Sequence, residues 1–131
     1  MPDQYRPEYI PAVDGDGGPA AMPGREPRDY YGTSRSAAPG WRNRVTRLSV
    51  RELITFDAAI GADFLAGIPA LFIHGRRDDS CSPAEAVYRR AQTADKEFAW
   101  LDTTSHIDLC DNPQYVDPAT ARRSDWLTKR L

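Results

Sequence analysis

A carboxylate and an imidazole each follow an apolar run in the second half of the chain. Asp78 comes three residues after Gly75, just past the run 70–74, and His106 lies in a polar loop after the run 97–102. If the two runs are neighbouring strands, the carboxylate can accept from one imidazole nitrogen and fix the tautomer. The other nitrogen is then left as a general base for a hydroxyl.

The run 70–74 is continuously apolar rather than alternating, which suits a strand buried on both faces of a parallel sheet, and 97–102 is expected to be a second strand. Between them, Ser82 and Glu85 have the spacing of a capping box with Pro83 at the first helical position, which predicts a helix over 83–92. A strand–helix–strand unit of this length is a right-handed crossover, so the strands are expected to be parallel. Ligands and reactive groups gather beyond the carboxyl ends of such strands.

Two further helices are expected around this unit. Ser49 and Glu52 form another capping box, and the apolar spacing behind it predicts a helix over 50–64. Asp117 and Pro118 are expected to open the last helix. Because two parallel strands leave open edges and a thin core, the predicted α/β unit is expected to be one end of a larger sheet.

The beginning of the chain has a different composition. The first forty residues hold seven of the eleven prolines and six of the nine glycines. Segments such as 14–19 and 23–27 are poor candidates for a helix or a ladder. We therefore predict a Pro/Gly-rich, irregular or partly disordered leader over 1–45 and an α/β portion over 46–131.

Charge and apolar content exclude several classes of function. The chain has 17 basic and 19 acidic residues, a net charge of −2, which argues against nucleic-acid and anionic-membrane partners. No run approaches the roughly 18 apolar residues of a membrane span, and the opening residues have no apolar signal-peptide core. A cytoplasmic protein with free thiols at Cys81 and Cys110 is the expectation. No His/Cys pairing completes a metal shell, so neither a metal nor a cofactor is expected.

Several segments resemble one known family. The stretch 68–78 resembles the acid-bearing strand and loop of α/β-hydrolases, and 96–109 looks like their last strand and histidine loop. Three segments further upstream are similar to the region before the acid loop in bacterial dienelactone-hydrolase-like proteins: 29–33, 39–43 and 53–57. The resemblance covers about residues 29–131 and implies the C-terminal portion of an α/β-hydrolase fold.

The resemblance implies a serine hydrolase acting on small esters or similar acyl compounds, without a cofactor. Asp78 takes the place of the triad acid, with Asp79 as the alternative because the doubled aspartate blurs the register, and His106 takes the place of the general base. The G-x-S-x-G nucleophile motif does not occur: its nearest counterpart, 32–36, lacks the final glycine. We therefore expect a truncated hydrolase portion, without its nucleophile or oxyanion hole and inactive alone.

Other interpretations stay open at this point. The open sheet edge could serve a non-catalytic interaction module that pairs with a second copy or a complementing chain. Ser34 could act as an unusual nucleophile. His74, within its apolar run, is interpreted as a packed, hydrogen-bonded imidazole, and Arg76 and Arg77 as solvated loop residues rather than ligands of a substrate carboxylate.

Overall fold

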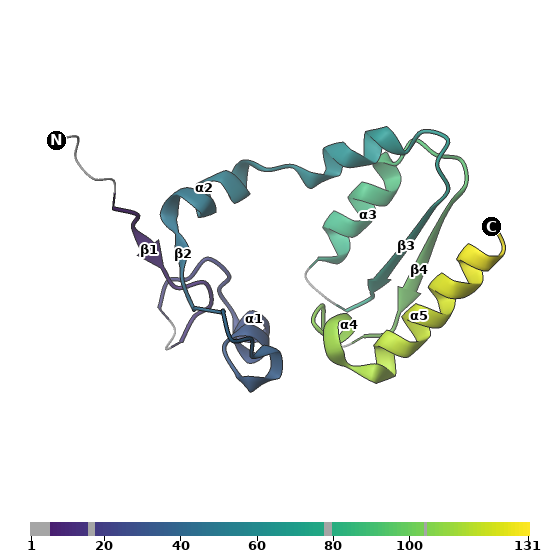
Figure 1. Ribbon diagram of the computed structural model, residues 1–131. Coiled ribbons are helices and arrows are strands. Elements are labelled where there is room, and N and C mark those ends of the chain that lie inside the picture. Colours follow the sequence, from purple (N-terminus) through teal and green to yellow (C-terminus); the bar gives the residue numbers. More distant parts are fainter. Residues whose placement is uncertain (1–5, 16–17, 78–79, 104) are drawn as a thin grey trace. The chain divides into compact units, whose positions relative to one another are not determined.

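The computed structural model describes residues 6–15, 18–77, 80–103 and 105–131 (Figure 1). The chain divides into two compact units, 1–56 and 57–131, each of which is described by itself. Helices and short strands are mixed, and the strands form one antiparallel and one parallel two-stranded sheet. The units separate at residue 56, whereas the change of composition that suggested a boundary lies at residue 45.

The first unit contains more regular structure than its composition suggests. Its antiparallel sheet pairs β1 with β2, and a reciprocal pair of hydrogen bonds joins the Asn43 side chain to the backbone N–H and C=O of buried Val13, at 2.9 and 3.0 Å. Pro27 lies in the first turn of α1, where its missing N–H has no helical partner to lose. Its elements are β1 (Tyr9–Ile10), α1 (Arg25–Tyr31), the 3-10 helix η1 (Ser34–Ser36), β2 (Val45–Thr46) and α2 (Arg47–Thr55).

The predicted helix over 50–64 is wrong, because two helices occupy this stretch. In α2 the cap is Thr46, whose hydroxyl accepts from the Ser49 N–H at 3.1 Å, so the helix begins before the predicted Ser49 cap. Phe56 is extended and ends α2. Asp57 then accepts from the Ala59 N–H at 2.9 Å and starts the 3-10 helix η2, Ala58–Leu65. A second cap inside the apolar pattern therefore divides it.

The second unit contains the predicted strand–helix–strand crossover. The elements are β3 (Ala70–Gly75), α3 (Cys81–Arg90) and β4 (Lys96–Leu101). The two strands are parallel, as predicted, with Ala70 opposite Lys96 and Gly75 opposite Leu101. The helix begins at Cys81 rather than Pro83, so the expected capping box at Ser82 does not form, and Ser80 occupies the N-cap position.

The chain ends in α4 (Asp108–Asp111) and α5 (Pro113–Thr128). The last helix does not open at Asp117 as predicted. Asn112 caps it by accepting from the Gln114 N–H at 3.2 Å, and Pro113 stands at its first position. Pro118 lies inside the helix, so α5 continues past a proline that the sequence suggested as a start.

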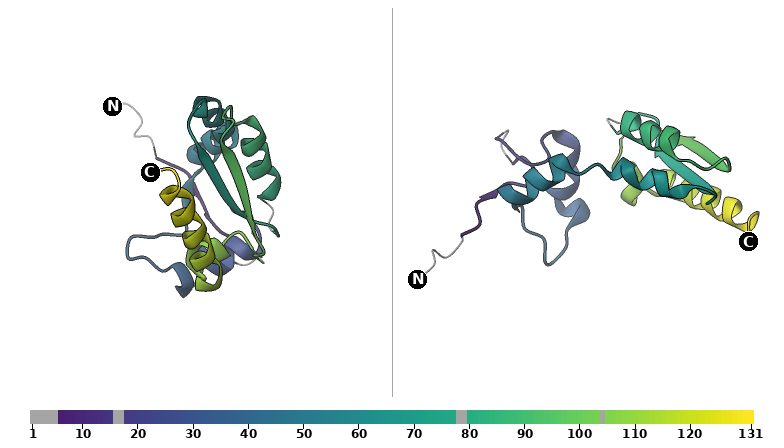
Figure 2. Two further views of the ribbon diagram at one scale, coloured as in Figure 1. Left: turned by 90° about the vertical axis from the view of Figure 1, so that its right-hand side faces the viewer. Right: turned by 90° about the horizontal axis from the view of Figure 1, so that it is seen from above.

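The parallel sheet lies between α3 and α5 (Figures 1 and 2). On the α3 face, the Phe98 ring stacks on Trp100 at 4.3 Å between centroids and meets Tyr88 of α3 edge-on at 5.3 Å. Phe72, opposite Phe98 in the register, contacts Tyr88 at 5.4 Å. On the α5 face, β3, α4 and α5 border an open hollow of about 300 Å³ that Ile73, Leu109 and Val116 help to line. The aromatic cluster is therefore the main packing contact between α3 and the strands.

Replacement of Phe98 by alanine is expected to destabilise the second unit. The substitution removes three ring contacts, and truncation of a packed phenylalanine costs about 3 kcal/mol. Phe64 of η2, which is 76% exposed, is the matched control, and Phe64→Ala should change stability by less than about 0.5 kcal/mol. Urea unfolding monitored by tryptophan fluorescence measures both. Equal effects of the two substitutions would contradict the packing described.

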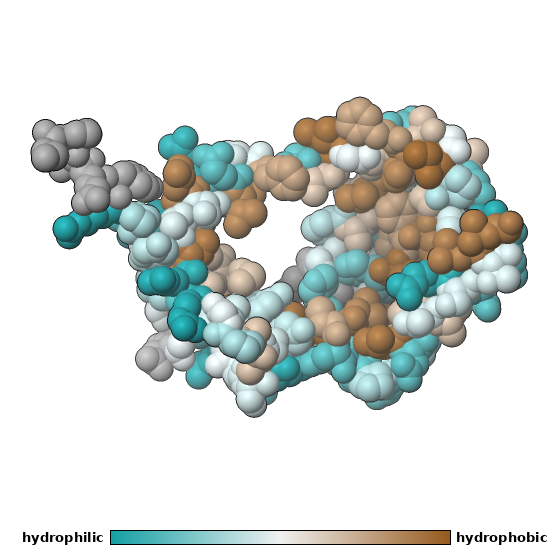
Figure 3. All heavy atoms as spheres, in the orientation of Figure 1, coloured by the Kyte–Doolittle hydropathy of each residue, from teal (hydrophilic) through white to brown (hydrophobic). Residues whose placement is uncertain are grey.

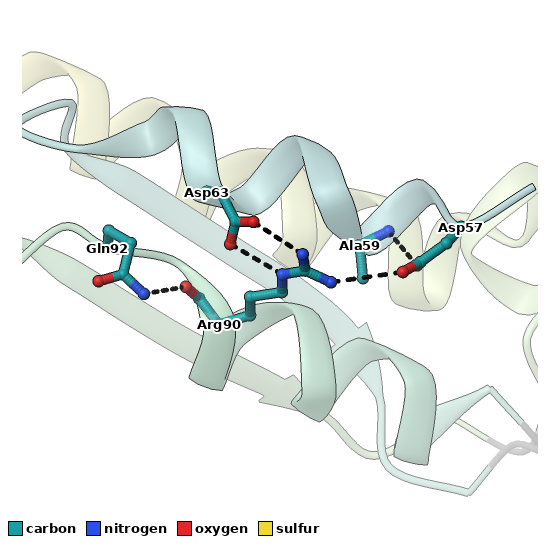
Figure 4. A network of polar contacts seen from close by, with 5 residues as sticks. All are labelled: Asp57, Ala59, Asp63, Arg90 and Gln92. Carbon is teal, nitrogen blue, oxygen red and sulfur yellow. Dashed lines mark hydrogen bonds and ion pairs between the residues drawn. The ribbon is translucent and has the colours of Figure 1, made fainter.

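Three basic side chains fasten the helices of the second unit. The Arg90 guanidinium of α3 donates to both carboxylate oxygens of Asp63, at 2.8 and 2.7 Å, and to Asp57 at 3.3 Å (Figure 4). Arg130, after α5, holds Asp95 before β4 in the same two-bond manner, at 3.2 and 2.6 Å. Hydrogen bonds from these guanidinium groups lower the pKa of Asp63 and of Asp95.

Lys96 Nζ donates to the Tyr88 and Ala91 carbonyls at the end of α3, each at 2.8 Å.

Stability is expected to fall in acid as these carboxylates take up protons. The folded-state pKa of Asp95 lies below its unfolded value, so its contribution is complete above about pH 4 and is lost as the pH falls through the folded pKa. Asp95→Asn should therefore destabilise the protein at pH 7. The difference in urea midpoint between this variant and the wild type should shrink towards pH 2. Urea midpoints across this range, at low salt, measure the difference.

Asp117→Asn is the control for this prediction, because Asp117 is an exposed carboxylate on α5 with no ion pair among the described residues. Its difference from the wild type should not shrink in the same way. If the urea midpoints of Asp95→Asn and the wild type differed by the same amount from pH 7 to pH 2, the result would contradict the assigned ion pair.

Both units leave apolar side chains exposed (Figure 3). In the second unit, Ile60 and Phe64 of η2 and the following Ile68 are 51, 76 and 53% exposed. In the first unit, Ile54 and Phe56 are 79 and 71% exposed. Among the described residues, no helix is both long enough and apolar enough to span a bilayer.

Candidate functional site

The loops after β3 and β4 lie together because the two parallel strands end in register. Gly75 and Leu101 are paired at the carboxyl edge, and the Arg76 N–H donates to the Leu101 carbonyl at 2.8 Å. One residue further along each loop, the Arg77 guanidinium forms an ion pair with the Asp102 carboxylate at 3.2 Å. The sequence-based expectation that both loops share one edge of the sheet therefore holds for the backbone.

Asp78 and Asp79, the two candidates for the triad acid, lie outside the described residues, so their role stays a prediction. The residues on either side of them are described. Arg77 contacts the loop after β4 through Asp102, and Ser80 contacts the same loop through His106. The segment that contains the candidate acid is thus joined at both ends to the loop that contains the candidate base.

His106 is exposed and takes part in a chain of three polar side chains. Its Nδ1 lies 2.9 Å from the Ser80 hydroxyl oxygen, and that same oxygen lies 3.2 Å from Nε2 of His74. His74 Nδ1 in turn lies 2.8 Å from the Gly75 carbonyl oxygen. The interpretation of His74 as a hydrogen-bonded imidazole is confirmed, and Ser80 joins it to His106.

The sequence pattern does not mark Ser80 as a site residue. A serine before a helix is usually interpreted as its N-cap, and the capping-box spacing favoured Ser82 two residues later. The structure gives Ser80 the N-cap position but shows no side-chain capping hydrogen bond from it. Its proximity to Asp78 was the one available signal, and spacing alone does not reveal which imidazole a side chain will contact.

Buried residues of the loop after β4 hold His106 in place. Thr103 and Ile107 are 0 and 5% exposed, one on each side of the histidine. Asp108, 7% exposed at the start of α4, accepts a hydrogen bond from the Ser105 N–H at 3.1 Å. The imidazole is thus exposed while the backbone that carries it is anchored on both sides.

The charged and sulfur-containing side chains nearby have contacts within the protein. Arg76 lies over the Trp100 ring, 5.4 Å from its centroid, and Arg77 is paired with Asp102. The Cys81 thiol donates to the Gly75 carbonyl at 3.1 Å. Cys81 and Cys110 are both free thiols. These contacts favour structural roles for the two arginines over capture of a substrate carboxylate.

Ser34, the alternative nucleophile, begins the short 3-10 helix η1 of the first unit. The residue before it, Thr33, is the N-cap and accepts from the Arg35 N–H at 3.2 Å. A nucleophile elbow requires a strand before the serine and an α-helix after it. Instead, α1 precedes Ser34 and the three-residue η1 follows, so the local structure does not form an elbow.

Asp108→Ala is expected to loosen the His106 loop. The substitution leaves the Ser105 N–H without its acceptor, and an unsatisfied buried donor costs about 1–3 kcal/mol. Amide hydrogen exchange at Ser105 and Ile107 should accelerate in the variant. Asp117→Ala, on the exposed surface of α5, should leave both amides unchanged. Unchanged protection in Asp108→Ala would show that this carboxylate does not anchor the loop.

Comparison with known proteins gives one informative match. The chain is similar to a protein of Escherichia coli (strain K12), Uncharacterized protein YcjY, with 30% identity over 107 residues. The match includes 82% of this chain but 35% of the relative, so the chain spans little more than a third of that protein's length. No family model and no solved structure matches the chain.

Proposed function

We propose that this chain supplies the acid and base of a serine-hydrolase site of the α/β-hydrolase type, acting on a small ester or similar acyl compound. The observation that carries the proposal is the meeting of two loops at the carboxyl edge of a parallel strand pair, with His106 exposed there. Acid–base groups of this fold class lie at that edge. The fold assignment itself, a C-terminal portion of an α/β-hydrolase similar to dienelactone hydrolases, is part of the proposal.

His106 acts as the general base. Its Nδ1 is held by a hydrogen bond within the site, so Nε2 is the nitrogen that takes the proton of a nucleophilic hydroxyl. The imidazolium then returns the proton to the leaving alcohol when the tetrahedral intermediate collapses. The carboxylate of Asp78, or of Asp79, stabilises the imidazolium in this step.

The nucleophile and the oxyanion hole come from a segment outside the 131 residues. The G-x-S-x-G string is absent from the sequence, and Ser34 lacks an elbow. Because the members of a catalytic triad act as a unit, the chain alone should have essentially no triad activity. The relative from Escherichia coli has a long region outside the matched part, and this region is a suitable partner for a test.

The test is a chimera in which this chain replaces the matched stretch of the Escherichia coli relative. The chimera should react covalently with a fluorophosphonate probe, whereas the chain alone should not. His106→Ala in the chimera should slow labelling at least about 10²-fold, since a positioned general base contributes about 10²–10⁴-fold. Ser105→Ala, in the same loop, is the control and should label at the rate of the unmodified chimera.

Two results would overturn the proposal. One is a folded chimera, shown by its circular dichroism and cooperative unfolding, that fails to react with the probe. The other is labelling that His106→Ala does not slow. Labelling of the chain alone that Ser34→Ala abolishes would assign the nucleophile to Ser34 instead.

A non-catalytic interaction module is the second candidate, and the open sheet favours it. Within the described residues, β3 and β4 pair only with each other, so each keeps one free edge, and η2 exposes Ile60 and Phe64. Free edges accept strands from partners, including a second copy of the chain. Sedimentation velocity of the chain alone distinguishes the interaction module from the hydrolase portion, and a stable dimer favours the module. A monomeric chain, together with a chimera that the probe does not label, would exclude both functions.

A further inference from the structure

The hydrogen bonds of β3 show which of its backbone groups face β4 and which face the open edge. The Ala70 N–H donates to the Asp95 carbonyl at 3.0 Å, and the Arg76 N–H also donates to a carbonyl of β4. Because backbone groups point alternately to the two sides of a strand, the residues at even positions bond to β4. The N–H and C=O groups of Leu71 and Ile73 therefore point to the other edge, where no strand of the described residues lies.

The two strands differ in charge. Between Ala70 and Gly75, β3 has no lysine, arginine, aspartate or glutamate. In contrast, β4 begins with Lys96 and Glu97, which contact the carbonyls at the end of α3 and Arg122 of α5, respectively. Charged residues protect an edge strand against further pairing, whereas a continuous apolar run is typical of a strand inside a parallel sheet. The composition therefore suits β4 to the edge of a sheet and β3 to its interior.

The helix before β3 indicates where a further strand belongs. Arg90 of α3 binds Asp63 of η2, and Figure 4 shows the two helices side by side in front of the strands. Crossovers between parallel strands are right-handed, so successive crossovers on one face of a sheet advance in the same direction. The crossover from β3 through α3 to β4 leads away from the open edge of β3. A strand that is connected to β3 through η2 therefore lies at that open edge, parallel to β3.

We infer that the open edge of β3 binds a parallel, apolar strand from the part of a longer protein that precedes η2, and that β4 remains the edge of the completed sheet. The matched stretch is 35% of the Escherichia coli relative, so most of that protein lies outside the match and can supply such a strand. In the 131 residues, Ile60 and Phe64 of η2 are 51 and 76% exposed (Figure 3). These apolar side chains cover the added strand.

This inference concerns the sheet and does not require hydrolase activity. It also differs from the interaction module, in which a second copy of the chain fills an edge. A chimera whose Leu71 and Ile73 amides are protected, but which the probe does not label, would refute the hydrolase proposal alone. A labelled chimera in which these amides exchange fast would refute this inference alone.

Amide hydrogen exchange tests the inference in the full 131-residue chain and in the chimera with the Escherichia coli relative. In the chain alone, the Leu71 and Ile73 amides should exchange faster than the Phe72 amide, which faces β4. In the chimera their exchange should slow at least about tenfold, because each N–H gains an acceptor on the added strand. The Phe98 and Trp100 amides, at the outer edge of β4, are the matched control and should exchange at the same rate in both proteins.

The inference is overturned if Leu71 and Ile73 exchange equally fast in the chain and in the chimera, or if the added protection appears at Phe98 and Trp100 instead. Slow exchange at Leu71 and Ile73 in the chain alone would also overturn it. In that case a dimer in sedimentation velocity would show that a second copy fills the edge, and a monomer would show that the edge is not open. If the Phe72 amide is fast in the chimera, so that β3 and β4 have not paired, the same measurement on the intact relative, at the aligned positions, replaces it.

Discussion

The parallel pairing of β3 with β4 is the constraint on which the second unit depends. Its register places Gly75 opposite Leu101, so both strands stop at the same edge and the loops that follow must share the space beyond it. A slip of one residue would move every side chain to the other face of the sheet. It would also separate the partners Arg77 and Asp102. The strand register therefore brings the two loops of the candidate site together, and the individual side chains act within that arrangement.

Packing and charge hold this register from the faces and from the far edge. The aromatic cluster of Phe98, Trp100 and Tyr88 joins the sheet to α3, and α5 covers the opposite face. Near the amino end of β4, Arg130 holds Asp95, while Lys96 caps the end of α3. These two contacts lie near the amino end of β4, away from the carboxyl edge. The polar side chains at the carboxyl edge are therefore not needed to hold the amino end of the sheet. The anchored, exposed His106 loop fits that division.

Local signals competed wherever the prediction of an element boundary was wrong. The chain offers serine, threonine, asparagine and aspartate at many positions, and each can cap a helix. Thr46, Ser80 and Asn112 occupy the N-cap positions, although spacing rules favoured Ser49, Ser82 and Asp117. An N-cap residue keeps a non-helical conformation, as Thr46 does at the end of β2 and Asn112 does after α4, so the choice depends on where the preceding element ends. A capping box therefore indicates that a helix begins nearby without fixing the residue.

The sequence by itself determined the strand–helix–strand order, the parallel pairing, and the meeting of two loops at one edge of the sheet. These follow from the continuous apolar run 70–74, the second predicted strand at 97–102, the length of the crossover and its fixed hand, all of which are local properties. Only the tertiary structure decided that Ser80 stands between His74 and His106, and that Asp108 holds the loop. A hydrogen bond between residues 26 positions apart requires a distance near 3 Å and one side-chain rotamer at each end. Residue spacing specifies neither, because packing around the sheet sets both.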